Sequence, residues 1–157
     1  MSSDVDVLVV GGGIAGVSLA YELSSDRSVC VVEAESSLAV HSTGRSAAMF
    51  LETYGNHVIR GLTTASRAFL LDPPDMVRST IMTPRPYVQF AAPGRADALT
   101  AAFDSLRDLS PDARLLDAAE TVECAPLLRR DAVDAAILEP GALDMDCLLY
   151  TSPSPRD

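Results

Sequence analysis

The sequence predicts an α/β fold built on a parallel sheet, and three neighbouring patterns support this prediction. An unbroken apolar run over Asp6–Val10 is followed directly by glycines, and continuous apolar runs are typical of strands buried in parallel sheets. A helical pattern of apolar residues covers Gly13–Ser24, and a second apolar run covers Val29–Val32. Two such strands joined by a helix form a right-handed parallel unit.

The rest of the chain continues to alternate between helical and extended patterns. The expected elements, in chain order, are a polar loop over 36–45, helices over 45–51 and 56–71, a strand over 87–91, a helix over 96–109, a short element at 115–116, a helix over 118–124 and a strand over 132–138. Prolines after Asp72 are expected to end the second helix. Asp117 and Glu120 have the spacing of a capping box.

Composition and charge exclude several classes of protein. The net charge of −10 over 157 residues argues against partners such as nucleic acid or an anionic membrane surface. The three cysteines have no paired spacing, so neither a disulfide scaffold nor a metal site is expected. The longest uncharged stretch, Val7–Tyr21, is shorter than the ~20 residues of a transmembrane span. The acidic start is unlike a signal peptide, so we expect a cytoplasmic protein.

A glycine loop between the first strand and helix predicts a dinucleotide site in a Rossmann-like unit. Gly11, Gly13 and Gly16 fit the pattern G-x-G-x-x-G, which allows a tight turn, close approach to a pyrophosphate and close helix packing. Glu33 follows the second strand at the offset expected for an acid that binds the adenosine ribose. An acid there disfavours the 2′-phosphate of NADP but does not separate NAD from FAD.

The last eleven residues differ from the rest of the chain. Residues 147–157 contain no alanine in an alanine-rich sequence, and they match a translated transposon-type sequencing adapter. A native Ser/Pro-rich tail is the alternative. We expect this tail to lie outside the fold, and the chain to be an amino-terminal fragment interrupted near Asp146.

The segment after the second strand resembles a known family. With the glycine loop and Glu33, His41-Ser-Thr-Gly-Arg-Ser-Ala-Ala48 is similar to the FAD-binding region of the D-amino-acid oxidase/glycine oxidase superfamily, and most of all to D-arginine dehydrogenase-like flavoproteins. Tyr54-Gly55, the helix after it and Thr83-Pro-Arg-Pro86 also fit. The resemblance extends over residues 4 to 146.

The resemblance implies non-covalently bound FAD and assigns residues to it. The residues expected at the diphosphate, the ribose and the flavin ring are Gly11, Gly12, Gly13, Ile14, Ala15, Gly16, Glu33, Ala34, Ser42, Thr43, Arg45, Ser46, Ala47 and Ala48. Small side chains let a backbone lie against a flat ring, which agrees with the second half of this set. From the residues alone, the Ser-Thr-Gly stretch could equally be a plain turn.

Three residues are expected to form the substrate pocket. Tyr54 matches a tyrosine that closes over the substrate, although the residues alone also allow a core aromatic. Met49 stands where the arginine-directed enzymes have an active-site His, and Tyr87 where they have a Glu that binds a cationic substrate side chain. With an alignment shifted by one residue, Tyr87 would be an ordinary strand residue.

These observations combine into one interpretation. We expect residues 1–75 to form the amino-terminal part of a FAD-binding domain. Residues 76–146 would begin an inserted substrate domain and then return toward the FAD-binding domain, and the whole would be truncated. The intact protein would oxidise an amino acid, a D-amino acid with a neutral side chain, to an imine and 2-oxo acid, with an electron acceptor that the sequence does not identify. A secondary amine or hydroxy acid is the alternative substrate, and a non-catalytic dinucleotide-binding module is the alternative class. The fragment alone is expected to be inactive.

Overall fold

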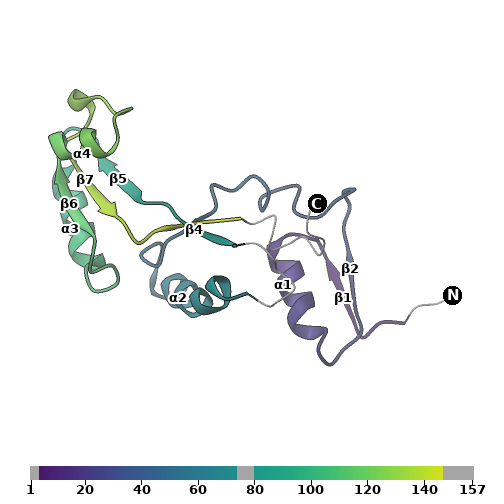
Figure 1. Cartoon of the computed structure of the whole chain (residues 1–157). Coiled ribbons are helices and arrows are strands. Elements are labelled where there is room, and N and C mark those ends of the chain that lie inside the picture. The colour runs from purple at the N-terminus through teal and green to yellow at the C-terminus, as the bar shows by residue number, and fades with distance from the viewer. Residues whose placement is uncertain (1–3, 74–79, 147–157) are drawn as a thin grey trace. The chain divides into compact units, whose positions relative to one another are not determined.

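The computed structural model describes residues 4–73 and 80–146. The elements, in chain order, are β1 (Val7–Val10), α1 (Ile14–Leu23), β2 (Val29–Val32), β3 (Met49–Phe50), α2 (His57–Leu71), β4 (Met82–Pro84), β5 (Tyr87–Ala91), α3 (Ala96–Leu106), β6 (Arg114–Asp117), α4 (Ala118–Cys124), a 3₁₀ turn η1 (Arg130–Ala132), β7 (Ala135–Glu139) and β8 (Leu143–Met145), as labelled in Figure 1. The mixed α/β class is confirmed. The predicted adapter tail lies outside the described residues.

The contacts divide the chain into two compact units. Within the described residues, the first unit holds 4–48, 69–73, 80–82 and 145–146, and the second holds 49–68 and 83–144. The expected boundary near residue 75 does not coincide with these divisions. The assignment of the two parts to a cofactor domain and a substrate domain stays a prediction.

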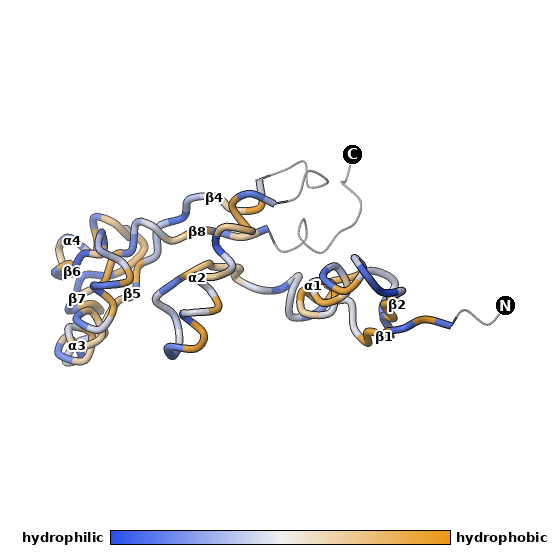
Figure 2. Tube along the Cα trace, turned by 90° about the horizontal axis from the view of Figure 1, so that it is seen from below, coloured by the Kyte–Doolittle hydropathy of each residue, from blue (hydrophilic) through white to orange (hydrophobic). Residues whose placement is uncertain are grey.

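The first unit contains the predicted strand–helix–strand unit. β1 and β2 are parallel and in register, with Val7 opposite Val29 and Val10 opposite Val32. Apolar residues, orange in Figure 2, make up most of β1. Val10 is nevertheless 81% exposed, and Leu8 is also exposed, so α1 alone does not bury this pair of strands. A continuous apolar strand is suited to a sheet covered on both faces, a cover that the described residues do not give these two strands.

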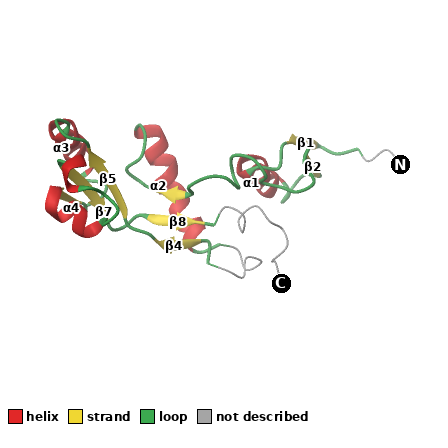
Figure 3. Ribbon diagram, turned by 90° about the horizontal axis from the view of Figure 1, so that it is seen from above, coloured by secondary structure: helices red, strands yellow, loops and turns green. Residues whose placement is uncertain are grey.

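The core of the second unit is an antiparallel sheet with strand order β5-β7-β6. Its central strand β7 is almost fully buried, and α3 and α4 lie beside the sheet (Figure 3). The buried side chains of this core include Leu99, Leu106 and Ile137, with Phe103 packed against them. The capping box at α4 is confirmed, because the Asp117 carboxyl accepts from the Glu120 N–H and the Glu120 carboxyl accepts from the Asp117 N–H.

The short helix expected over residues 45–51 is wrong. The chain turns through this stretch and then forms β3, which pairs antiparallel with β8. Ala48 has a left-handed backbone (φ 54°), which is incompatible with a continuing right-handed helix. Met49 and Phe50 fit the helix expected over 45–51 when only their sequence neighbours are considered. The strand that pairs with them, β8, is distant in sequence, so a local pattern could not indicate this pairing.

Candidate functional site

The glycine loop has the conformation that its spacing predicts. Gly11 adopts φ +104°, a region open to glycine, and its N–H donates to the Val32 carbonyl at 2.8 Å. A Cβ atom on Gly16 would lie 2.0 Å from the Gly11 carbonyl oxygen. The start of α1 can therefore lie this close to the end of β1 only because residue 16 has no side chain.

The amino-terminal end of α1 is arranged to receive an anion. The N–H groups of a first helical turn have no intrahelical acceptors, and the helix dipole adds positive potential there. The first turn contains no acidic residue, and Gly13 contributes no side-chain cap. Thr43 supplies one acceptor from outside the helix, because its hydroxyl accepts from the Ile14 N–H at 3.1 Å. A Cβ atom on Gly13 would lie 3.2 Å from that hydroxyl, so the helix end, the loop and Thr43 are closely fitted.

The Glu33 carboxyl group is bound by backbone N–H groups at the edge of the loop. Gly12 donates to Oε2 at 2.7 Å, while Ala34 and Glu35 donate to Oε1 at 2.7 and 3.1 Å. These bonds, the one from Gly12 foremost and then that from Glu35, lower the pKa of Glu33 below its ordinary value. Glu33 is therefore ionised at neutral pH and held beside the glycine loop, where a ribose could donate to it.

The remaining cofactor residues of the predicted set make local contacts. Arg45 donates its N–H to the His41 carbonyl, and the Ala48 N–H donates to the Ser46 hydroxyl. Ser42, Arg45, Ser46 and Ala47 are exposed, so their groups are accessible to a ligand. Of this segment the structure joins Thr43 to the glycine loop, whereas the flavin-facing role of the others stays a prediction.

The three predicted substrate residues lie in the second unit. Met49 is half-buried in β3, opposite Asp144 of β8. Tyr54 is 71% exposed among the described residues, and its role at the substrate stays a prediction. Tyr87 begins β5 and is half-buried, directly opposite Glu139 of β7. The described contacts do not bring the three side chains together.

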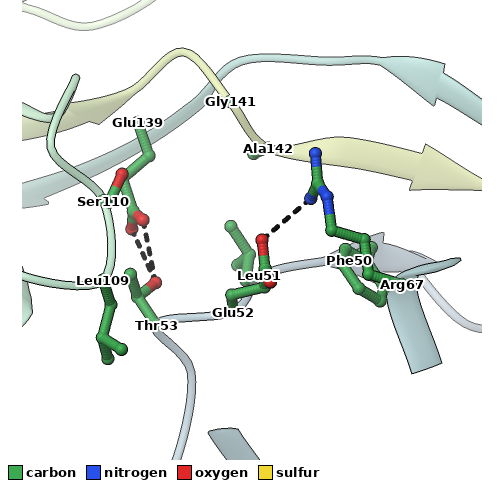
Figure 4. A pocket seen from close by; sticks show the side chains of 10 residues that line it. All are labelled: Phe50, Leu51, Glu52, Thr53, Arg67, Leu109, Ser110, Glu139, Gly141 and Ala142. Carbon is green, nitrogen blue, oxygen red and sulfur yellow. Dashed lines mark hydrogen bonds and ion pairs between the residues drawn. The ribbon is translucent and has the colours of Figure 1, made fainter. Parts of the chain in front are cut away.

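A small pocket in the second unit lies next to these residues in sequence. It has a volume of about 110 Å³ and is shown in Figure 4; its lining residues are Phe50, Leu51, Glu52, Thr53, Arg67, Leu109, Ser110, Glu139, Gly141 and Ala142. Two polar pairs line it. The Thr53 hydroxyl donates to the Glu139 carboxyl, and Arg67 forms an ion pair with Glu52 at 2.8 Å.

The sequence analysis missed Thr53 and Glu139. They are 86 residues apart, so no spacing motif could relate them. One signal was available for Glu139: it ends an apolar strand and precedes Pro140-Gly141, much as Glu33 directly follows β2. No comparable signal marks Thr53.

The parallel unit, the glycine loop and the acid at the end of β2 define a dinucleotide-binding α/β protein. The sequence model of one protein family, described as FAD dependent oxidoreductase, matches residues 6–152. The chain therefore belongs to this family of FAD-dependent oxidoreductases, and the expectation of FAD as cofactor is confirmed at the level of the family.

Several solved structures share the fold of this chain. Glycine oxidase from Geobacillus kaustophilus superposes with a TM-score of 0.80 at 20% identity, over 95% of this chain and 42% of that chain. FAD-bound L-α-glycerophosphate oxidase from Mycoplasma pneumoniae superposes with a TM-score of 0.77 at 20% identity, over 94% of this chain and 40% of that chain. L-proline dehydrogenase from P. horikoshii superposes with a TM-score of 0.76 at 20% identity, over 98% of this chain and 41% of that chain. The chain thus spans about two fifths of the length of these proteins.

Membrane-spanning helices and metal clusters are both absent from the described residues. No helix within residues 4–73 and 80–146 is long and apolar enough to cross a membrane. In the same part of the chain, no group of three or more His, Cys, Asp or Glu side chains is placed to hold a metal ion.

Proposed function

We propose that this chain is part of a flavoenzyme that oxidises an amino acid at its Cα–N bond. The imine product would then hydrolyse to a 2-oxo acid and ammonia. One observation carries the cofactor half of this proposal: the glycine loop at the start of α1 lies beside an ionised Glu33, in a chain of a FAD-dependent family. When bound, FAD supplies the acceptor for the hydride that leaves the substrate Cα.

The residues present fit a dinucleotide. Gly16 permits the close approach of α1 to the end of β1 that any Cβ would block, and the Ala15 and Gly16 N–H groups at the start of α1 would bind the diphosphate. Glu33 and the Ala34 backbone would hold the adenosine ribose through its hydroxyl groups. Ser42, Thr43 and residues 45–48 would border the diphosphate and the flavin ring, with no covalent attachment.

We propose a D-amino acid with a neutral side chain as the substrate. Tyr87 can stack on or hydrogen-bond to a substrate, but a phenol gives no full charge to a guanidinium or ammonium group. Met49 adds a soft apolar surface. A buried cation without a partner is strongly disfavoured. Tyr54, exposed next to the positive-φ Gly55, would cover the bound substrate.

The test of the cofactor site uses the complete protein. The purified protein should carry flavin absorbance that is released on denaturation, and Glu33→Gln should weaken FAD binding about tenfold or more, as a lost charge-assisted hydrogen bond does. Glu22→Gln, an exposed acid on α1, is the matched control and should bind FAD normally. A colourless protein that binds NAD but not FAD would contradict the proposal.

The test of the reaction is a substrate panel scored by flavin bleaching. Neutral D-amino acids such as D-leucine and D-methionine should bleach the flavin faster than D-arginine or the L-enantiomers. Bleaching by none of the amino acids would refute the proposed reaction.

A second substrate class has support from the fold neighbours. One is named as a proline dehydrogenase and another as a glycerophosphate oxidase, which act on a secondary amine and an alcohol respectively. Sarcosine, proline and 2-hydroxy acids therefore belong in the same panel. A protein that binds FAD but is bleached by no substrate would favour the non-catalytic module. The cytoplasmic location stays a prediction, which fractionation of the source cells would check.

A further inference from the structure

Glu139 and Thr53 form a buried polar pair that the cofactor site does not use. Glu139 ends β7 and is 5% exposed, and Thr53 is 8% exposed. The Thr53 Oγ1 lies 3.0 and 2.8 Å from the two carboxyl oxygens of Glu139 (Figure 4). Within the described part of the chain, Thr53 is the one side chain that donates to this carboxyl group. Because a buried carboxyl group without a donor is costly, each of the two residues depends on the other.

The hydrogen bond between Thr53 and Glu139 joins the two segments next to the proposed substrate residues. Thr53 immediately precedes Tyr54 in the chain. Glu139 is the register partner of Tyr87 in the antiparallel pair of β5 and β7, and residues directly opposite each other project from the same face of a sheet. A single hydrogen bond between segments 86 residues apart therefore links the backbones that carry both proposed substrate residues.

The contacts made by the side chains differ between Thr53 and its neighbour Tyr54. Glu52 is held by Arg67 of α2, whose guanidinium also lies 6.0 Å from the centre of the Phe50 ring. Thr53 is held by Glu139. The next residue, Tyr54, is exposed and makes no side-chain hydrogen bond within the described residues, and Gly55 then turns the chain at φ +79° into α2. Asn56 follows, and its side chain accepts from the Val58 and Ile59 N–H groups at the start of α2. The exposed Tyr54 side chain therefore projects from a segment whose backbone is anchored on both sides.

We infer that Thr53 and Glu139 are positioning residues for substrate capture: their bond fixes the base from which Tyr54 reaches the substrate and aligns that base with Tyr87. This inference rests on the proposed function, since it assigns a role to the residues around the same substrate. In this role Thr53 acts through Tyr54 and does not itself contact the substrate or the cofactor.

The kinetic test compares two buried threonines of the second unit in the complete protein. Thr53→Val keeps the shape and removes the donor, so KM for the best amino acid should rise about tenfold while kcat changes by less than about threefold. Thr53→Ser should restore KM. The control is Thr121→Val, which removes a buried hydroxyl bonded to the Asp117 carbonyl and should lower Tm while leaving KM unchanged.

A double-mutant cycle tests whether Thr53 acts through Tyr54. In a Tyr54→Ala background, Thr53→Val should raise KM no further, because the side chain that it positions is absent. The inference is overturned if Thr53→Val leaves KM at the wild-type value, or if it raises KM equally in both backgrounds.

A third measurement does not depend on turnover. Amide hydrogen exchange over residues 50–56 should be about tenfold faster in Thr53→Val than in wild type, and unchanged in Thr121→Val. Unchanged exchange would overturn the inference whatever the kinetics. If wild-type protein oxidises no amino acid, the proposed function fails, yet the exchange still shows whether the pair orders this segment. Should Thr53→Val not fold, Glu139→Met, which keeps the length and removes both acceptors, should shift KM and exchange in the same direction, and wild-type values for both would overturn the inference.

Discussion

Glu33 and Glu139 occupy the same kind of position in the chain but accept hydrogen bonds from different kinds of donor. Each follows or ends a short apolar strand, β2 in one case and β7 in the other. Glu33 accepts three backbone N–H groups from residues at a loop edge, and part of its carboxyl group stays accessible. Glu139 is buried and accepts one hydroxyl from a distant segment. The two proposed roles, ribose binding for Glu33 and ordering of the fold for Glu139, therefore rest on the donors that each carboxyl group meets rather than on its place after a strand.

The largest effect is expected when residues 1–146 are expressed without the rest of the protein. Residues 1–146 expressed alone should show no turnover and weak FAD retention, because a dinucleotide is normally enclosed by both halves of its domain, and exposed Leu8 and Val10 leave the β1–β2 pair uncovered. Exposed strand edges also favour aggregation. Flavin retention, turnover and light scattering of this fragment check the prediction. Measurable amino-acid oxidation by residues 1–146 would contradict it.

The next largest effect is expected at Gly16, where a side chain does not fit, with Gly61, where one does, as the control position. Gly16→Val should abolish FAD binding and destabilise the protein by at least about 3 kcal/mol, because its Cβ would lie 2.0 Å from the Gly11 carbonyl oxygen. Gly61→Ala is the control: no atom lies within 4 Å of a Cβ there, and alanine in the interior of α2 should stabilise by about 0.5–1 kcal/mol. Thermal unfolding and flavin titration measure both changes. Normal FAD affinity in Gly16→Val would show that the close approach is unnecessary.

The two sites also differ in how far the sequence could predict them. The glycine loop was predictable because its parts follow one another along the chain: a strand, a turn that needs glycine, a helix start and an acid after the next strand. Local rules of backbone conformation and helix polarity fix such an arrangement. The capping box at Asp117 was predictable for the same reason.

The second unit was less predictable because its contacts connect distant segments. The helices around Leu62 and Leu99 were found from their periodicity, whereas β3 and β8 were missed because each is short and exists through its partner. The pair of Thr53 and Glu139 joins a loop and a strand that are 86 residues apart, which periodicity cannot relate. Tyr54 was placed by family resemblance, and the structure adds that its side chain is exposed.

A smaller effect is expected at Tyr87, where the substrate side chain is proposed to lie. Tyr87→Glu in the complete protein should shift the ratio of kcat/KM for D-arginine over D-leucine upward by roughly tenfold, about 1.4 kcal/mol, because the variant adds a charge partner for the cation. It also places a second carboxyl group opposite Glu139 on the neighbouring strand, so Tm should fall.

Tyr87→Gln separates these two consequences. It has a similar size to the glutamate variant without the charge, so it should neither favour D-arginine nor lower Tm by repulsion. A wild-type protein that already prefers D-arginine would contradict the pocket assignment, and Glu139 would then be the first acid to test as the counter-charge.

The smallest effect is expected at a third acid that ends a strand. Asp117 closes β6, and like Glu33 it accepts backbone N–H groups, here from Ala119 and Glu120 at the start of α4. The bond from Glu120, followed by that from Ala119, lowers the pKa of Asp117 below its ordinary value of 3.8. A lowered pKa in the folded state means that the ionised cap stabilises the protein above pH 3.8 and loses this contribution as the pH falls through the lower folded value.

Asp117→Asn tests whether this acid is only a helix cap. Asparagine still accepts the capping bonds but has no charge, so at neutral pH Tm should drop slightly and FAD affinity should not change. The difference in Tm from wild type should shrink as the pH is lowered below the ordinary aspartate pKa, which thermal unfolding at a series of pH values measures. Weakened FAD binding at neutral pH would mean that a strand-end acid of the second unit does more than cap a helix. The distinction between ligand-binding and fold-organising carboxyl groups drawn from Glu33 and Glu139 would then not extend to Asp117.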